Sequence, residues 1–421
     1  MIKVKEKDFR RYIYLVLLTI IGIVSHDSVA TLIVCALQVV IIISKAKFSF
    51  VSVFVFILNY CLIPEFIAYG GGVVPGLLGL NYIKTYYFEL FYCCTALNLI
   101  SGAFVFYTNF LKNEKAIYST NYNFSTITVR VMAVVSIILT ILIFPYLSFG
   151  FDTTNRFNSG IISFSGWSCI PFFLLSLGLL SKKCKKMVYG TTLFVCFWYV
   201  LHGERVDVLG LFVFFILVYF NSGEQVSKNR FKIKFKMGII ALSFFIILIF
   251  VGVARSGNEF SFIYVIQSLF AQQTACDVVN VFNAAVDSCY RNKLFKGITY
   301  LSYLINCIPM VEDKYSFERL ISKAEYHSVG GGLFFAEPIA NFGFAFCVFE
   351  IILYFFLINK LIKRKTQYRS LVFAELCLSI FRTAWYGLNY PIVTILYFVP
   401  FVLVFNNMTI KGANIPRIRE D

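Results

Sequence analysis

Apolar runs recur from one end of the chain to the other, and short polar stretches separate them. A helix needs about 20 apolar residues to cross the roughly 30 Å hydrocarbon core of a bilayer. The runs predict twelve membrane-spanning helices, near 12–25, 29–44, 48–68, 86–110, 131–149, 161–181, 188–202, 206–220, 237–254, 338–358, 369–386 and 390–406. The seventh and eighth are short and are joined by His202-Gly203-Glu204-Arg205, so they form either a tight hairpin or broken helices.

The composition agrees with this pattern. Of the 421 residues, 59% are apolar and only 14% are charged, whereas soluble globular domains contain roughly 25% charged residues. A soluble chain this apolar would lack the polar groups to cover its surface. The fold class expected is therefore an all-α polytopic membrane protein of about 12 transmembrane helices, rather than two or three soluble domains.

The distribution of basic residues predicts the orientation of the chain. The net charge is +16, and the proposed cytoplasmic segments carry 27 of the 38 Lys and Arg residues, as the positive-inside rule requires. Six more fall in one long loop, which leaves five in the short outer segments: Lys84, Arg156, Arg205, Arg255 and Arg382. This bias places both termini in the cytoplasm. The basic N-terminus resembles a signal peptide, but the further runs favour a first span.

Three regions follow from the predicted spans: helices 1–9 over 1–254, a long outer loop over 255–337, and helices 10–12 with a cytoplasmic tail over 338–421. Within the loop, Phe260, Ile263, Ile266 and Phe270 recur at helical spacing, which is typical of an amphipathic helix on the membrane surface. Two further segments stand out there: an apolar run over 297–309 that is too short to span, and a second amphipathic helix over 315–326.

The cysteines add little chemistry. Most of the twelve lie inside apolar runs, where they act as small apolar residues. Cys276, Cys289 and Cys307 fall in the long loop, where a disulfide has only weak support. No CxxC pair with metal-ligand spacing occurs.

Three of the arginines in the short outer segments are candidates for a binding site, because few basic residues are expected on the outer side. Arg205, Arg255 and Arg382 are expected at a similar depth, and guanidinium groups suit phosphate oxygens. Together they would form a site for a lipid pyrophosphate headgroup. The alternative is structural: Arg205 pairs with Glu204 or Asp207, and the other two anchor helices at the interface.

A second constellation enters the tenth span. The glycines Gly330, Gly331 and Gly332 would let the backbone approach a ligand closely, followed by Glu337, Pro338 and Asn341. Pro338 favours a helix start there, whose free N–H groups would bind an anion. Both His327 and Glu337 are candidates for a general base, and a flexible polar loop is the structural alternative.

Two further acids lie within predicted spans. Glu350 and Glu375 act either as proton relays or as hydrogen-bonding groups inside the bundle.

On these residues the chain resembles the Wzy-type polymerases, which polymerise the oligosaccharide repeat units of bacterial O-antigen. The resemblance is carried by the twelve-span pattern with one large loop before the last three spans, and by three segments. These are Gly203-Glu204-Arg205, Ala254-Arg255-Ser256-Gly257 and the glycine segment through Gly343. As architecture it covers most of the chain, but as motif only about thirty residues.

The resemblance implies an enzyme at the periplasmic face of the bacterial inner membrane. Such polymerases transfer a glycan from undecaprenyl pyrophosphate to the non-reducing end of a lipid-linked repeat unit. In this chain Arg205, Arg255 and Arg382 would hold the pyrophosphate, and His327 or Glu337 would activate the acceptor hydroxyl. It implies a lipid-linked oligosaccharide as substrate and a chain-length regulator protein as partner. No cofactor is expected, and because no acidic pair indicates a divalent metal, a metal-independent reaction is expected.

Three alternatives stay open. A lipid-linked oligosaccharide flippase would carry charges within its spans and only short loops. An O-antigen ligase would use the same donor with a lipid A core acceptor. A small-solute transporter would show helices broken at the midplane.

Overall fold

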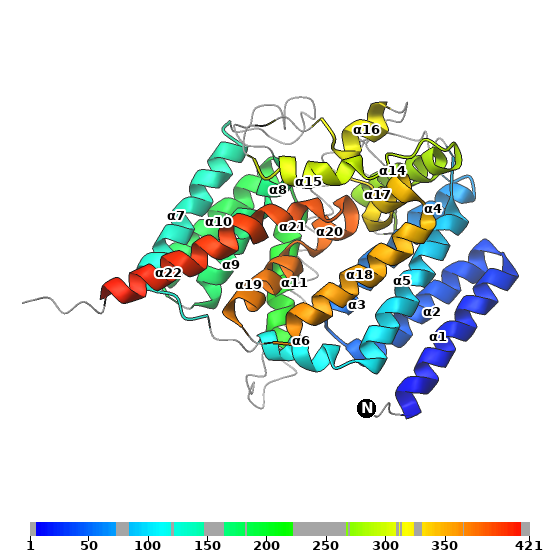
Figure 1. Ribbon diagram of the computed structural model, residues 1–421, viewed down its shortest axis with the longest axis horizontal. Helices are drawn as coiled ribbons and strands as arrows, with labels where there is room; N and C mark the ends of the chain where they lie inside the picture. The colour runs from blue at the N-terminus through cyan, green and yellow to red at the C-terminus, as the bar shows by residue number, and fades with distance from the viewer. Residues whose placement is uncertain are drawn as a thin grey trace, which may run out of the picture.

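The computed structural model describes residues 6–72, 84–118, 122–146, 164–181, 183–221, 267, 270–308, 311, 314–323, 331–364 and 366–413. Throughout this described part the ordered elements are helices, and no strand occurs (Figure 1). The first half contains α1 (Glu6–Ser25), α2 (Ser28–Ala46), α3 (Phe50–Tyr60), α4 (Leu62–Tyr69), α5 (Tyr87–Tyr107), α6 (Phe110–Tyr118), α7 (Thr126–Ile143), α8 (Phe164–Trp167), α9 (Cys169–Leu180), α10 (Lys185–Leu201) and α11 (Val206–Asn221). The second half contains α14 (Gln273–Tyr290), η1 (Ile298–Tyr300), α15 (Leu301–Ile305), α16 (Phe317–Lys323), α17 (Leu333–Phe342), α18 (Phe344–Ile362), α19 (Gln367–Leu378), α20 (Ile380–Tyr386), α21 (Asn389–Val393), the π-helical segment η2 (Thr394–Phe398) and α22 (Val399–Ala413).

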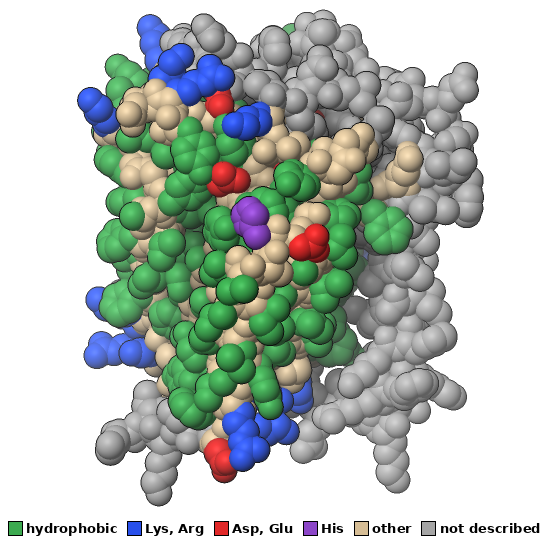
Figure 2. Space-filling model, turned by 90° about the vertical axis from the view of Figure 1, so that its right-hand side faces the viewer, with side chains coloured by type: hydrophobic (Ala, Val, Ile, Leu, Met, Phe, Trp, Pro, Cys, Tyr) green, Lys and Arg blue, Asp and Glu red, His purple; other side chains and the backbone are tan. Residues whose placement is uncertain are grey.

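Six of the described helical segments are long and apolar enough to cross a membrane. They are Ser28–Ala46, Phe50–Tyr69, Tyr87–Tyr107, Thr126–Ile143, Phe344–Ile362 and Asn389–Ile410. On the described part of the face in Figure 2, hydrophobic side chains cover most of the surface, and most Lys and Arg side chains lie toward its two ends. The protein is therefore an α-helical protein built to lie in a membrane, while twelve spans remain a prediction.

Most predicted spans coincide with helices, but several of these helices are broken. The predicted span 161–181 breaks at Ser168, and 369–386 breaks at Ser379. The predicted span 390–406 contains a π-helical segment. The predicted span 237–254 lies outside the described residues.

The helix expected to start at Pro338 in fact starts earlier. Helix α17 begins at Leu333, so Pro338 lies inside it and the boundary expected at 337 falls within a helix. Helix formers follow Gly332 directly, and a proline six residues into a helix removes only one backbone hydrogen bond. Gly343, with φ of 84°, separates α17 from α18, so the long apolar helix here is Phe344–Ile362 instead of 338–358.

Polar side chains fasten the first helices to one another. The amide of Gln38 donates to Thr19 Oγ1 at 2.7 Å, linking α2 to α1. Asn98 of α5 donates to Gln38 Oε1 at 3.0 Å and exchanges two hydrogen bonds with Asn59 of α3. Hydrogen bonds between buried amides stabilise helix pairs in the apolar medium of a membrane, where the surrounding lipid offers no partners.

The described part of the long loop is packed into the molecule. Figure 1 places α14, α15 and α16 at the top, at the opposite end from the N-terminus. Helix α16 falls within the amphipathic helix expected over 315–326, and η1 and α15 form from the short apolar run. Helix α14 was not predicted: it is buried over nearly its whole length and packs against α17 and α4. Of the other expected amphipathic helix only Phe270 is described, and it is 58% exposed.

Candidate functional site

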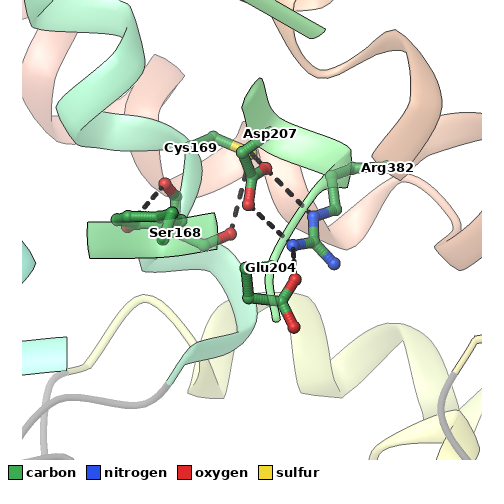
Figure 3. Close-up of polar contacts among 6 residues, drawn as sticks. Ser168, Cys169, Glu204, Asp207 and Arg382 are labelled. Atoms are coloured by element: carbon green, nitrogen blue, oxygen red, sulfur yellow. Dashed lines mark hydrogen bonds and ion pairs between the residues drawn. The ribbon is translucent and has the colours of Figure 1, made fainter. Parts of the chain in front are cut away.

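A buried ion cluster joins the start of α11 to α20. Arg382 is 2% exposed, and its Nε and Nη2 atoms donate to the two carboxylate oxygens of Asp207 at 3.0 and 2.6 Å (Figure 3). The same Nη2 donates to Glu204 Oε2 at 2.6 Å. Two carboxylates therefore hold one guanidinium, and the three groups together carry a formal charge of −1.

Local sequence explains why both acids face Arg382. Gly203 adopts a φ of 74°, a left-handed conformation that ends α10 and turns the chain sharply. The N–H of Glu204 donates back to Tyr199 O at 2.8 Å, so the turn is short and defined. Glu204 and Asp207 then stand three residues apart at the N-terminus of α11, where acidic groups are also favoured by the helix dipole.

Arg382 was expected to bind a pyrophosphate, but its guanidinium already binds two acids of the protein. Its planar fork is committed to Asp207 and Glu204, and the negative cluster disfavours a second anion at the same guanidinium. The two acids named in the structural alternative, Glu204 and Asp207, both bind Arg382. This arrangement assigns Arg382 a positioning role for the segment that contains Arg205.

Two tyrosines separate Arg382 from a cavity. The guanidinium carbon lies 5.1 Å from the ring centroids of both Tyr386 and Tyr390, within the range of cation–π attraction. Both rings line a cavity of about 340 Å³, a volume within the usual range for small-molecule sites. The cavity is also lined by Ser302, Tyr303, Asn306, Val311, Ser316, Phe317, Glu318, Arg319, Gly331, Glu337 and Asn389.

Arg205 lies beside this cavity. It is partly buried, and Tyr386 and Asp277 are close enough to act on its charge. Burial lowers the pKa of Arg205 from its ordinary value, and an arginine still stays charged at neutral pH because its ordinary pKa is so high. Of the three arginines singled out in the sequence, the structure thus brings Arg205 and Arg382 to one region, and Arg255 lies outside the described residues.

Glu337 is held inside the cavity by two hydroxyl groups. Thr299 donates to its Oε1 at 2.6 Å and Tyr303 donates to its Oε2 at 2.5 Å. Burial raises the pKa of Tyr303, and the carboxylate of Glu337 raises it further, so the phenol remains a donor. A methyl group built on Gly387 would lie 3.4 Å from Glu337 Oε2, which places the carboxylate against the end of α20. Of the two base candidates, His327 lies outside the described residues.

Asn341 is not at the cavity surface, contrary to the expectation of a substrate-loop residue. It is fully buried, and its amide donates to Thr299 Oγ1 at 2.7 Å and to Glu337 O at 2.9 Å. Its Oδ1 accepts from Gly297 N at 2.8 Å. Asn341 therefore fastens the segment that carries Thr299 and positions Glu337 indirectly.

The glycines approach protein groups closely. Gly331 lines the cavity with φ of 67°, and a methyl group there would lie 2.3 Å from Tyr386 Cδ1. At Gly332 a methyl group would lie 2.7 Å from Val281 of α14. Gly330 lies outside the described residues. The close approach expected for a ligand is thus made here to α20 and α14.

Glu350 and Glu375, the two acids expected inside spans, differ in their hydrogen bonding. Glu350 is 8% exposed and accepts from Tyr300 Oη at 2.7 Å, as the hydrogen-bonding alternative proposed. Glu375 is completely buried in α19, and among the described residues no hydrogen bond of full geometry reaches either carboxylate oxygen, although Thr394 is close enough to act on its charge.

Sequence reasoning missed several groups at the cavity. Arg319 supplies a cation and Tyr303 a donor to Glu337, although 301–305 and 317–323 had been recognised only as short apolar or amphipathic segments. Among the residues that the structure describes, no three His, Cys, Asp or Glu side chains are grouped to hold a metal ion. All twelve cysteines are free thiols.

Comparison of the chain with protein-family models, with curated proteins and with solved structures gives no match. The geometry of the cavity and its ion cluster therefore carries the functional argument.

Proposed function

We propose that the protein is an O-antigen polymerase of the inner membrane, which extends a lipid-linked glycan at the cavity lined by Glu337. The observation that supports this most is the meeting of three chemistries at one end of an apolar bundle. The cavity combines a carboxylate held by two hydroxyl donors, a wall of tyrosine rings and the cation Arg319, and Tyr386 of that wall is close enough to Arg205 to act on its charge. Tyrosine rings suit sugar faces, and guanidinium groups suit a pyrophosphate.

In the proposed reaction the acceptor hydroxyl oxygen attacks the anomeric carbon of the donor glycan. The bond from that carbon to the pyrophosphate oxygen breaks, and inversion at the carbon follows from direct attack. The hydroxyl proton passes to Glu337, whose Oε2 already accepts from Tyr303. Undecaprenyl pyrophosphate leaves with its negative charge stabilised by Arg205 and Arg319.

Arg382 has a supporting role in this proposal. Its bonds to Glu204 and Asp207 fix the residues on either side of Arg205. A preorganised cation stabilises a developing charge better than a mobile one, because no reorganisation is needed during the reaction.

The decisive experiment uses the purified full chain in proteoliposomes with an undecaprenyl-pyrophosphate-linked repeat unit as both donor and acceptor. A ladder of longer glycans on a gel is expected. Glu337→Gln and Arg205→Gln are each expected to slow extension about 10²-fold or more. Glu89→Gln and Arg291→Gln remove matching charges at exposed hydrogen-bonded or ion-paired positions and are expected to leave it unchanged.

A flippase is the second candidate, because Glu114 and Glu375 are buried within the bundle, as charges on a transport path would be. The same proteoliposomes separate the candidates. Translocation of a labelled lipid-linked unit without any ladder would reject the polymerase and favour the flippase. Transfer only when lipid A core is added would favour the ligase.

A further inference from the structure

A second cavity lies at the end of the bundle opposite the proposed active site. Its volume is about 500 Å³, and it is lined by Thr108, Asn109, Asn113, Asn359, Lys363 and Arg364. It forms where α5 ends, α6 begins and α18 ends, at the bottom of Figure 1 near the N-terminus. The distribution of basic residues predicts that this end faces the cytoplasm.

The cavity is cationic. In the described part of the chain, neither Lys363 nor Arg364 forms an ion pair or a side-chain hydrogen bond. The acid on the adjacent helix, Glu114, points into the bundle, where its Oε1 accepts from Phe50 N at 2.6 Å and from Tyr118 Oη at 3.2 Å. Two positive charges thus face the space without a compensating carboxylate from α6, which favours an anion.

The cavity also contains polar groups suited to a ligand. Asn359 is 7% exposed, and its Oδ1 has no hydrogen-bond partner among the described residues. A buried acceptor of this kind costs free energy unless a donor reaches it. Asn109 and Asn113 add two amides beside the N-terminus of the nine-residue helix α6, whose dipole favours negative charge. The first N–H of this helix, that of Phe110, donates to Thr108 Oγ1 at 3.1 Å. The ligand should therefore combine an anion with a hydroxyl donor.

The surface above the cavity indicates a lipid. Ile352 and Phe356 of α18 are 46% and 53% exposed. Positions 352, 356, 359 and 363 follow one another at steps of four, three and four residues. These spacings place all four residues on one face of the helix. An acyl chain lying along Ile352 and Phe356 would bring its headgroup to the cavity.

We propose that this cavity binds the headgroup of an anionic glycerophospholipid that carries a free hydroxyl. The phosphate lies between Lys363 and Arg364, and the hydroxyl donates to Asn359 Oδ1. Basic pockets between transmembrane helices at the cytoplasmic side are suited to such headgroups. The site is separate from the proposed polymerase chemistry and does not depend on it.

The test is native mass spectrometry of the purified full chain in detergent, titrated with lipids of matched acyl chains. Phosphatidylglycerol is expected to bind at least about tenfold more tightly than phosphatidylethanolamine. The Lys363→Gln, Arg364→Gln double variant should lose this preference. The double variant Lys185→Gln, Lys186→Gln, which removes two exposed lysines outside the cavity, should retain it. Retention of the preference by the first variant, or its loss in the second, would overturn the proposal.

A second comparison tests the hydroxyl. Phosphatidylmethanol carries the same charge without a headgroup hydroxyl, and it should bind more weakly than phosphatidylglycerol to the unmodified chain. Asn359→Leu should abolish this difference and keep the preference over phosphatidylethanolamine. Equal binding of the two anionic lipids by the unmodified chain would reject the assigned role of Asn359. Complete displacement of phosphatidylglycerol by millimolar inorganic phosphate would reassign the site to a soluble anion. Unchanged gel-filtration profiles establish that the variants are folded.

Discussion

Replacing Arg382 by methionine tests the buried ion cluster most directly. The side chain is nearly inaccessible, and it makes three charge-assisted hydrogen bonds, two to Asp207 and one to Glu204. Methionine fills a similar length without a charge. It leaves two carboxylates at a buried position without this cation.

The expected cost follows from desolvation. Removal of one partner from a buried ion pair typically costs about 3–5 kcal/mol, because the remaining charge stays buried without compensation. Here two acids lose the same cation, so the upper half of that range is expected. Arg382→Lys keeps the charge but loses the planar fork, and a loss of about 1.5–3 kcal/mol is expected, the value of one hydrogen bond to a charged group.

The assay is unfolding of the full chain in mixed micelles with increasing SDS, followed by tryptophan fluorescence and circular dichroism. A double-mutant cycle combines Arg382→Met with Asp207→Asn. If the pair is coupled as described, the double variant should be more stable than the sum of the two single losses predicts, by at least about 1 kcal/mol. Additive losses within about 0.5 kcal/mol would refute the reasoning, since independent sites behave in that way.

Three further outcomes are expected. Gly331→Ala should lose about 1–3 kcal/mol in the same unfolding assay, because its methyl group would clash with Tyr386; Gly190→Ala, which meets open space, should lose nothing. Tyr303→Phe removes a donor from Glu337, so the acidic limb of the pH profile of glycan extension should move to higher pH, whereas an unchanged profile would exclude Glu337 as the titrating base. Extension should continue in EDTA, and its loss with recovery on adding magnesium would contradict the metal-independent mechanism.

The apolar pattern of the sequence predicted where most helices lie, because apolar length is what a membrane span requires. It did not predict their breaks. Ser168 separates α8 from α9, and Gly166, with φ of 82°, and Pro171 flank that break in the sequence. Ser379 separates α19 from α20, which contain no proline or glycine, so that break depends on packing between neighbouring helices. The opposite error occurred at Pro338, where a residue that usually marks a helix start lies inside α17. The helix-forming residues that precede Pro338 outweigh the preference of proline for the first turn of a helix.

The sequence predicted several of the charged residues that belong to the candidate site, but not which of them contact one another. The predicted topology singled out Arg205 and Arg382 as basic residues on the outer side. The sequence analysis also named the acids Glu204, Asp207 and Glu337. Which acid binds which arginine depends on how α11 and α20 meet, and no spacing along the chain encodes that contact. Helix α14 does carry a one-sided apolar pattern but was not predicted; its burial on almost every side depends on its contacts with α17 and α4, which no spacing along the chain encodes.

The ion cluster separates two roles that the sequence could not distinguish. Arg382 is surrounded by acids and tyrosines, so its charge is largely used within the protein. Asp277 and Tyr386, which belongs to the tyrosine wall of the cavity, are close enough to Arg205 to act on its charge. Substitution of Arg382 should therefore act through stability and geometry, and substitution of Arg205 through the charge offered to a substrate. In the proposed function, the same residue type thus contributes a fixed framework in one case and a binding group in the other.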